Sequence, residues 1–304
     1  MIPESIDTAN VQFSPDSLFA LNIILGFIMF GVALELSIED FRRVLRKPKA
    51  PLIGLVSQFF VLPFLTFLAV WILPVTPSMA LGMFLVAACP GGNISNFISS
   101  LAKANVALSV SLTAFSTLLA MFLTPINFSF WASLYPPSAE ILQTINLDEW
   151  ELVKTVFLLL GAPLILGMWT AYKFPKFTRK ISRPIRIFSI LFFVAFVMIA
   201  LYNNFAVFQE FIQSIILLVL IHNALALGGG YLMARLGGLP RADRKSITIE
   251  TGIQNSGLGL IIIFNFFNGL GGMAVITAWW GIWHIIAGLS LAFLWSDRRI
   301  LAPS

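Results

Sequence analysis

Residues 246–260, SITIETGIQNSGLGL, place a carboxylate, two amides and three glycines inside a run that is otherwise apolar enough to cross a membrane. Backbone groups within the hydrocarbon must find partners inside the protein, so an ionisable side chain followed by glycines needs a protein-lined or wet cavity there. A second polar stretch, CPGGNISN at residues 89–96, interrupts another apolar segment in the same way. Two interrupted segments predict one shared binding centre.

The composition of the whole chain indicates a polytopic membrane protein. Of its 304 residues, 58% are hydrophobic and 11% are charged, whereas a soluble domain carries about 25% charged residues. The single cysteine, Cys89, excludes an internal disulfide and a cysteine metal cluster. Residues 1–17 show neither the basic region nor the cleavage pattern of a signal peptide, so the first apolar segment is expected to be a retained helix.

Nine apolar segments approach the roughly 20 residues that a membrane-spanning helix needs. They are residues 18–38, 50–73, 78–102, 105–127, 151–171, 186–206, 212–234, 246–267 and 274–296. All 19 lysines and arginines except Lys154 fall on alternate connections, and the longest connection, residues 128–150, has none. The positive-inside rule then predicts an external N-terminus and a cytoplasmic C-terminus, with residues 128–150 outside. Because topology explains the basic surplus, we expect no nucleic-acid partner.

The two polar stretches approach the bilayer midplane from opposite faces. At 1.5 Å per residue, Pro90 lies about 18 Å from the external end of its span, and Glu250 to Asn255 lie about 8 to 15 Å from the cytoplasmic end of theirs. Discontinuous helices around a central site are typical of inverted-repeat secondary transporters. We therefore predict an all-α membrane protein with nine transmembrane helices, in one transmembrane domain over residues 1–304. Its half-repeats would cover about 18–127 and 151–297, the first lacking its leading helix.

Glu250 is the most informative single residue. One interpretation is a carboxylate wetted near the cytoplasmic headgroups, with Lys245 as its partner. The other is a cation ligand, because a buried carboxylate needs a positive partner and a hard cation such as Na⁺ takes oxygen donors. Apart from Lys154, no lysine or arginine is predicted at that depth in another span. A bound cation would supply the missing charge.

Further oxygen donors are predicted near Glu250. Ser109, Thr113 and Ser116 share one helix face, although such a stripe is also typical of small-residue helix packing. The helix-breaking step at residues 90–92 lacks the Gly-Lys-Ser/Thr continuation of a nucleotide loop. It presents three polar side chains: Asn93, Ser95 and Asn96.

Four more polar side chains lie within apolar spans: Gln58, His222, Asn223 and His284. Each alone is more often an interhelical hydrogen bond than a ligand. A zinc site is not expected from two histidines. No Ser-His-Asp arrangement and no pair of carboxylates at hydrolase spacing is visible, which argues against an enzyme.

At these residues the chain resembles the bile acid sodium symporter family. The matching stretches are SQFFVLP (57–63), CPGGNISN (89–96), NVALSVSLTAFSTL (105–118) and ITIETGIQNSGL (247–258). The resemblance covers nearly the whole chain and implies the nine-helix form of the family. It implies a core domain of the second to fourth and seventh to ninth helices and a panel domain of the first, fifth and sixth. The third and eighth helices would be unwound where they cross.

The resemblance also implies two Na⁺ sites and a substrate site. The first Na⁺ site would use Ser95, Asn96, Ser109, Thr113 and Glu250. The second would use Gln58, Glu250 and Gln254, with backbone carbonyls near Thr251 and Ile253. The substrate would lie between core and panel, against Asn93, Asn255 and His284.

These inferences predict a sodium-coupled symporter that imports an organic anion, such as a bile acid or a related carboxylate, by alternating access. We expect it to act as a monomer in a plasma membrane, the inner membrane of a bacterium. One alternative is a proton-coupled or uncoupled carrier in which Glu250 titrates. Another is a non-transporting membrane sensor, which the lack of a sizeable cytoplasmic domain disfavours. The sequence does not choose among organic anions.

Overall fold

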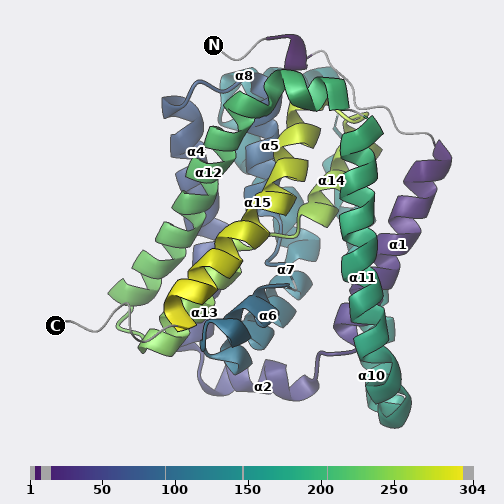
Figure 1. Cartoon of the computed structure of the whole chain (residues 1–304), viewed down its shortest axis with the longest axis vertical. Coiled ribbons are helices and arrows are strands. Elements are labelled where there is room, and N and C mark those ends of the chain that lie inside the picture. The colour runs from purple at the N-terminus through teal and green to yellow at the C-terminus, as the bar shows by residue number, and fades with distance from the viewer. Residues whose placement is uncertain (1–3, 8–14, 93, 146, 204, 297–304) are drawn as a thin grey trace.

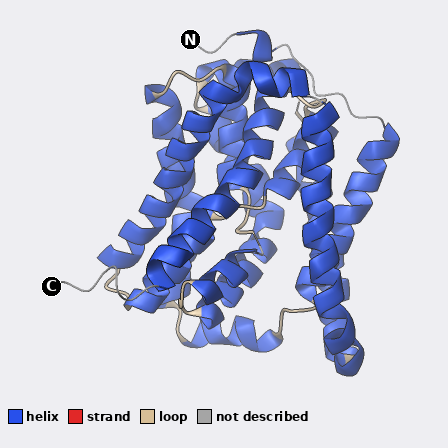
Figure 2. Cartoon of the chain, in the orientation of Figure 1, coloured by secondary structure: helices blue, strands red, loops and turns tan. Residues whose placement is uncertain are grey.

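The computed structural model describes residues 4–7, 15–92, 94–145, 147–203 and 205–296. Within these ranges every regular element is helical, and strand-like pairing is confined to one isolated bridge between Gly91 and Gln254. Figure 2 shows the helices and the loops that join them. The predicted all-α class is confirmed.

The helices follow closely on one another along the chain. In order they are η1 (Glu4–Asp7), α1 (Pro15–Ala33), α2 (Ile38–Arg46), α3 (Lys49–Val56), η2 (Ser57–Val61), α4 (Leu62–Ile72), α5 (Pro77–Ala88), α6 (Ile94–Leu101), α7 (Val106–Ser133), α8 (Pro136–Ile145), α9 (Glu149–Val156), η3 (Phe157–Gly161), α10 (Ala162–Lys173), α11 (Pro175–Asn203), α12 (Phe205–Leu236), α13 (Arg241–Gly252), α14 (Ser256–Phe266) and α15 (Gly271–Ser296).

Several of these helices are suited to a membrane. In the described residues, five stretches are long and apolar enough to cross one: Lys49–Ile72, Val106–Ser133, Glu149–Lys173, Ile215–Leu236 and Gly271–Ser296. A sixth is counted if Asn22–Ala33 and Ile38–Arg46, bent by 70°, form one span. The helices α5 and α14 are apolar but shorter. The chain is thus a multi-span membrane protein, and the count of nine spans stays a prediction.

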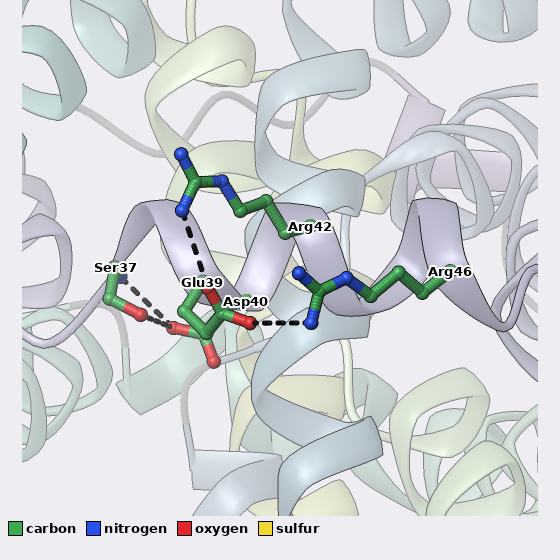
Figure 3. A network of polar contacts seen from close by, with 5 residues as sticks. All are labelled: Ser37, Glu39, Asp40, Arg42 and Arg46. Carbon is green, nitrogen blue, oxygen red and sulfur yellow. Dashed lines mark hydrogen bonds and ion pairs between the residues drawn. The ribbon is translucent and has the colours of Figure 1, made fainter.

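The first predicted span, residues 18–38, ends earlier than expected. The helix α1 stops at Ala33, and the amphipathic helix α2 begins at Ile38. Asp40 stabilises the start of α2, because its Oδ2 accepts hydrogen bonds from the backbone N–H and the hydroxyl of Ser37, at 2.9 and 2.6 Å (Figure 3). Exposed ion pairs then join Glu39 to Arg42 and Arg46, at 3.7 and 3.6 Å (Figure 3). These local polar contacts favour a new helix over a continued span.

The connection predicted at residues 128–150 is mostly helical. The helix α7 continues to Ser133, and α8 packs against α5 and α7. The Ser138 hydroxyl donates to the carbonyl oxygens of Ala132 and Tyr135, at 2.7 and 3.0 Å. The Ala132 carbonyl is among the last of α7, where carbonyls have no partner within their own helix. A side chain in the first turn of α8 thus bonds to the end of α7, a contact that hydropathy alone does not predict.

Two pairs of short helices lie end to end through the middle of the molecule. Figure 1 shows α5 and α14 in the upper half, and α6 and α13 in the lower half. All of α5 from Ser78 to Ala88 is buried, and it packs against α15 and α7. On one side of this bundle, α1 packs against α10 and α11 (Figure 1). The ends of the four short helices meet at the candidate site.

Candidate functional site

The two polar stretches meet through their backbones. The Gly92 N–H donates to the Ile253 carbonyl at 2.7 Å, and the Asn255 N–H donates to the Pro90 carbonyl at 2.9 Å. Both connections lie where helices end, at Ala88 and at Gly252. Each stretch therefore satisfies polar groups that the other leaves without a helical partner.

Glycine allows this close approach. A Cβ atom at Gly91 would lie 2.8 Å from Glu250 Cδ, and one at Gly92 would lie 3.0 Å from the Gln254 carbonyl oxygen. Separations this short are tighter than van der Waals contact. Glycine at both positions lets the Glu250 carboxylate and the crossing backbones occupy the same region.

The Glu250 carboxylate is buried and accepts bonds from hydroxyl groups on two other helices. Its side chain comes from α13 and is 2% exposed. Ser95 on α6 donates to Oε2 at 2.6 Å. Thr113 on α7 donates to Oε1 at 2.8 Å, and Ser109 on α7 lies 3.4 Å from Oε2. Three helices thus meet at one carboxylate.

Asn96 completes this cluster. Its Oδ1 accepts bonds from the hydroxyls of Ser109 and Thr113, at 2.8 and 3.2 Å. The structure therefore brings together all five residues predicted for the first Na⁺ site. Ser116, from the same predicted stripe, bonds to the Thr113 carbonyl of its own helix at 3.2 Å and does not join the carboxylate.

Three of the residues predicted for the second Na⁺ site, Gln58, Gln254 and Thr251, are joined by hydrogen bonds. Gln58 Nε2 donates to Gln254 Oε1 at 2.7 Å and to the Cys89 carbonyl at 2.8 Å. Gln254 Nε2 donates to the Thr251 carbonyl at 2.7 Å. Gln58 Oε1 is buried without a hydrogen-bond partner, although it is a strong acceptor.

The position of Gln58 follows from a proline. Pro63 has no N–H to donate to the carbonyl of Phe59. The helix instead widens into a π turn over Ser57–Val61, where the Leu62 N–H bonds to the Ser57 carbonyl five residues back. Gln58 lies in this turn, buried against both polar stretches.

No cationic side chain neutralises Glu250 among the residues that the structure describes. The carboxylate bonds to three hydroxyl groups and forms no ion pair there. Lys245 instead donates to the carbonyl oxygens of Ala102 and Trp295, at 2.7 and 3.3 Å. The hypothesis of a wetted Glu250 paired with Lys245 therefore finds no contact to support it.

The donor set suits a hard cation. Carboxylate, hydroxyl and amide oxygens surround the crossing, and hard cations prefer such oxygens. Over the described ranges, His, Cys, Asp and Glu side chains form no group of three or more that could hold a metal. Neutral oxygens around a single carboxylate match a singly charged cation better than a zinc ion.

The three predicted substrate contacts lie in different surroundings. Asn93 lies outside the described residues. Asn255 Oδ1 caps α14 by accepting from the Leu258 N–H at 3.1 Å, and its Nδ2 lies 4.0 Å from Met29 Sδ on α1. His284 on α15 is 4% exposed, and its Nδ1 has no hydrogen-bond partner.

One polar contact was not predicted, and another was expected only as an interhelical hydrogen bond without a named partner. Asn22 on α1 and Asn265 on α14 exchange hydrogen bonds through both amides, at 3.3 and 3.2 Å. Asn223 on α12 donates to the Gly252 carbonyl at 2.7 Å. In each case the sequence feature that could have indicated the contact is an amide side chain within an apolar span. His222, in contrast, bonds to Thr66 Oγ1 at 2.6 Å, away from the carboxylate cluster.

Comparison with known proteins gives concordant matches. The model of the Sodium Bile acid symporter family matches residues 22–211. The uncharacterized sodium-dependent transporter YocS of Bacillus subtilis (strain 168) is 33% identical over 95% of this chain and 88% of its own length. The probable chloroplastic sodium/metabolite cotransporter BASS2 of Oryza sativa subsp. japonica is 30% identical over 91% of this chain and 64% of its own. The ileal sodium/bile acid cotransporter of Homo sapiens is 27% identical, over 80% and 68% respectively.

Proposed function

The chain belongs to the Sodium Bile acid symporter family, and we propose that it couples the inward movement of Na⁺ to the uptake of an organic anion. The family and its named relatives are sodium-dependent transporters, not enzymes. One observation carries the proposal. Glu250, 2% exposed, lies among hydroxyl and amide oxygens from two other helices and has no cationic partner in the described part of the chain.

The proposed topology has nine spans in one transmembrane domain. Four of them combine several helices: α3 with η2 and α4, α5 with α6, α9 with η3 and α10, and α13 with α14. The third and eighth spans are then the interrupted ones. The basic residues around α2 indicate the cytoplasmic side, which leaves the N-terminus outside. The two half-repeats are residues 18–127 and 151–297, and the protein works as a monomer in the plasma membrane of its cell, the inner membrane in a bacterium.

The proposed core and panel domains are supported by the packing of the helices. The panel comprises the first, fifth and sixth spans, and the contacts of α1 with α10 and α11 support it. The core comprises the other six spans, and the contacts among α5, α6, α7, α13 and α15 support it. Asn255 and Asn265, on the core side, contact α1. The panel–core boundary therefore borders the polar stretches.

The first proposed Na⁺ site replaces hydrogen bonds around Glu250 with ion contacts. Its ligands are Ser95, Asn96, Ser109, Thr113 and Glu250, whose oxygens already form one hydrogen-bonded group. Desolvating a carboxylate costs several kcal/mol unless an opposite charge and well-placed hydrogen bonds compensate. A bound Na⁺ supplies that charge, and it holds α6, α7 and α13 together.

The second proposed Na⁺ site shares Glu250 with the first. Its ligands are Gln58, Glu250 and Gln254, with the carbonyls of Thr251 and Ile253. The unpartnered Gln58 Oε1 supports this site, because a buried acceptor without a donor is costly and a cation would satisfy it. Each backbone carbonyl also keeps a second lone pair for an ion.

The proposed substrate site lies between core and panel, against Asn93, Asn255 and His284. The helices α6 and α14 both begin at this region, at Ile94 and Ser256. Helix N-termini favour negative charge, which supports an anionic substrate such as a bile acid or a related carboxylate. Na⁺ would favour the substrate-binding conformation by its differential affinity for the two states. The membrane potential would contribute about 2.3 kcal/mol per charge per 100 mV.

Uptake into proteoliposomes tests the proposed function. Bile acids, sterol sulfates and small carboxylates are first screened for anions that stabilise the purified protein only in the presence of Na⁺. Uptake of such an anion should stop when external Na⁺ is replaced by K⁺ or choline. Uptake that survives the replacement and follows pH would instead support a proton-coupled or uncoupled carrier. Binding of an anion without any uptake would support the sensor.

Substituting Gly91 should weaken Na⁺ binding. In Gly91→Ala the new methyl group would overlap the Glu250 carboxylate, so the cluster must shift. Overpacking of a buried site costs about 1 to 3 kcal/mol, which, if it falls on the Na⁺-bound state, corresponds to about a 5- to 150-fold loss of affinity. Na⁺-dependent thermal stabilisation measures it. The matched control is Gly228→Ala, whose methyl group would meet no atom within 4 Å. Equal Na⁺ responses of the two variants would contradict the prediction.

A further inference from the structure

Two buried amides bond to the ends of the two interrupted helices. Gln58 Nε2 donates to the Cys89 carbonyl, directly after α5, at 2.8 Å. Asn223 Nδ2 donates to the carbonyl of Gly252, the last residue of α13, at 2.7 Å. The last carbonyls of a helix have no partner in that helix, and no water is available in the hydrocarbon to replace one. Each amide therefore caps one interrupted helix from a neighbouring span.

The two amides share a second property. Both side chains are 1% exposed, and the oxygen of each, Gln58 Oε1 and Asn223 Oδ1, lacks a hydrogen-bond partner. Gln58 has a place in the proposed second Na⁺ site, whereas Asn223 has no place in either proposed site. Asn223 bonds to the end of α13 as Gln58 bonds to the end of α5. This similarity indicates that both amides hold the place where the two interrupted helices cross.

Packing fixes Asn223 on the Gly252 carbonyl. Leu227 lies one turn beyond Asn223 on α12, and a Cβ atom at Gly252 would lie 2.6 Å from its Cγ. The absence of a side chain at Gly252 thus lets α12 approach the end of α13. The hydrogen bond then sets the orientation of the peptide between Gly252 and Ile253. Gly252 is two residues after Glu250. Along the chain its carbonyl lies between the carbonyls of Thr251 and Ile253, which are proposed Na⁺ ligands.

We propose that Asn223 is a positioning residue for Na⁺ binding. Its amide holds the end of α13 so that Glu250 and the neighbouring carbonyls face the ion, without touching the ion itself. This inference rests on the proposed function, because it assumes that Na⁺ binds beside Glu250. The Gly252 carbonyl lies between two proposed ligands along the chain, so we expect its loss of a partner to act like the loss of an outer partner of a metal ligand, which typically lowers metal affinity about 10- to 100-fold. A hydrogen bond that only joins two helices would leave the affinity unchanged.

The test compares Asn223→Leu with Thr66→Val in purified full-length protein. Leucine has the same branched arrangement of heavy atoms but cannot donate a hydrogen bond. Thr66→Val is the matched control, because it removes a buried bond to His222, the neighbouring residue of α12, at 2.6 Å. The measurement is the Na⁺ concentration that gives half of the maximal thermal stabilisation, with K⁺ at constant ionic strength. Asn223→Ser, whose hydroxyl is too short to reach Gly252, provides a second variant if the leucine variant does not fold.

Asn223→Leu or Asn223→Ser should raise the half-maximal Na⁺ concentration at least about tenfold, and Thr66→Val should leave it at the wild-type value. In transport, the Asn223 variants should recover the wild-type maximal rate at high Na⁺. An unchanged half-maximal Na⁺ concentration in the Asn223 variants overturns the role of Asn223. A wild-type protein that does not respond to Na⁺ overturns the proposed function instead, so the two failures are distinct.

Discussion

Glu250→Gln should lose the stabilisation of the protein by Na⁺ and its Na⁺-driven uptake. Glutamine keeps the size of the side chain and one oxygen, but it removes the negative charge that the ion needs. Its amide group would also donate hydrogen bonds to the oxygens of Ser95 and Thr113, which now donate to the carboxylate. At a Na⁺ concentration 100-fold above Kd, the wild type should gain about 2.7 kcal/mol from Na⁺ binding, and the variant nothing.

Thermal unfolding of both proteins in Na⁺ and in K⁺ measures this loss. Glu39→Gln is the matched control, because the Glu39 carboxylate forms only exposed ion pairs with Arg42 and Arg46 in the described structure. The control should respond to Na⁺ like the wild type. A wild-type response of Glu250→Gln would contradict a Na⁺ site at Glu250. Uptake by the wild type that follows the pH gradient and not Na⁺ would favour the proton-coupled alternative.

Cross-linking α1 to α14 should stop transport completely. The reciprocal amide bonds of Asn22 and Asn265 join a proposed panel helix to a proposed core helix. Alternating access requires these two bodies to move relative to each other. The variant carries Asn22→Cys and Asn265→Cys in a Cys89→Ala background, which lacks the single native cysteine. A short reducible bifunctional thiol reagent should link the two positions and abolish uptake.

Reduction of the cross-link should restore uptake to the level before treatment. Each single-cysteine variant, treated with the same reagent, controls for modification of one side chain. Both single variants should keep transporting, because they leave the helices free to separate. Full uptake by the doubly substituted, cross-linked protein would mean that α1 and α14 do not separate during transport, and the proposed panel and core would be wrong.

Much of the carboxylate cluster could be predicted because polar residues are conspicuous in apolar spans. Glu250 and the Pro-Gly-Gly step at residues 90–92 stand out in this way. The spacing of Ser109 and Thr113 correctly places both on one face, and both bond toward Glu250. The same spacing included Ser116, which bonds within its own helix. Periodicity predicts which residues share one face of a helix. It does not predict which of them lies level with the Glu250 carboxylate on the neighbouring helix. The assignment of residues to two ion sites came from the family resemblance.

The remaining features depend on contacts between spans. The start of α2 depends on the capping contact between Ser37 and Asp40. The helix α8 is joined to the end of α7 through Ser138, which donates to the Ala132 carbonyl. Neither is visible in hydropathy, which measures apolar length alone. Asn223 was noticed as a mid-span amide, but its partner, the Gly252 carbonyl, is a backbone atom on another helix. No pattern within one span can identify such a partner.

Binding of radiolabelled Na⁺ to purified protein tests the central claim most directly. It requires no knowledge of the substrate and reports on the ion itself. The wild type should bind Na⁺ saturably, excess unlabelled Na⁺ should displace the label, and K⁺ should not. Glu250→Gln should show no saturable binding, while Glu39→Gln should bind like the wild type. Absence of saturable binding to the wild type, or equal binding by Glu250→Gln, would contradict the account.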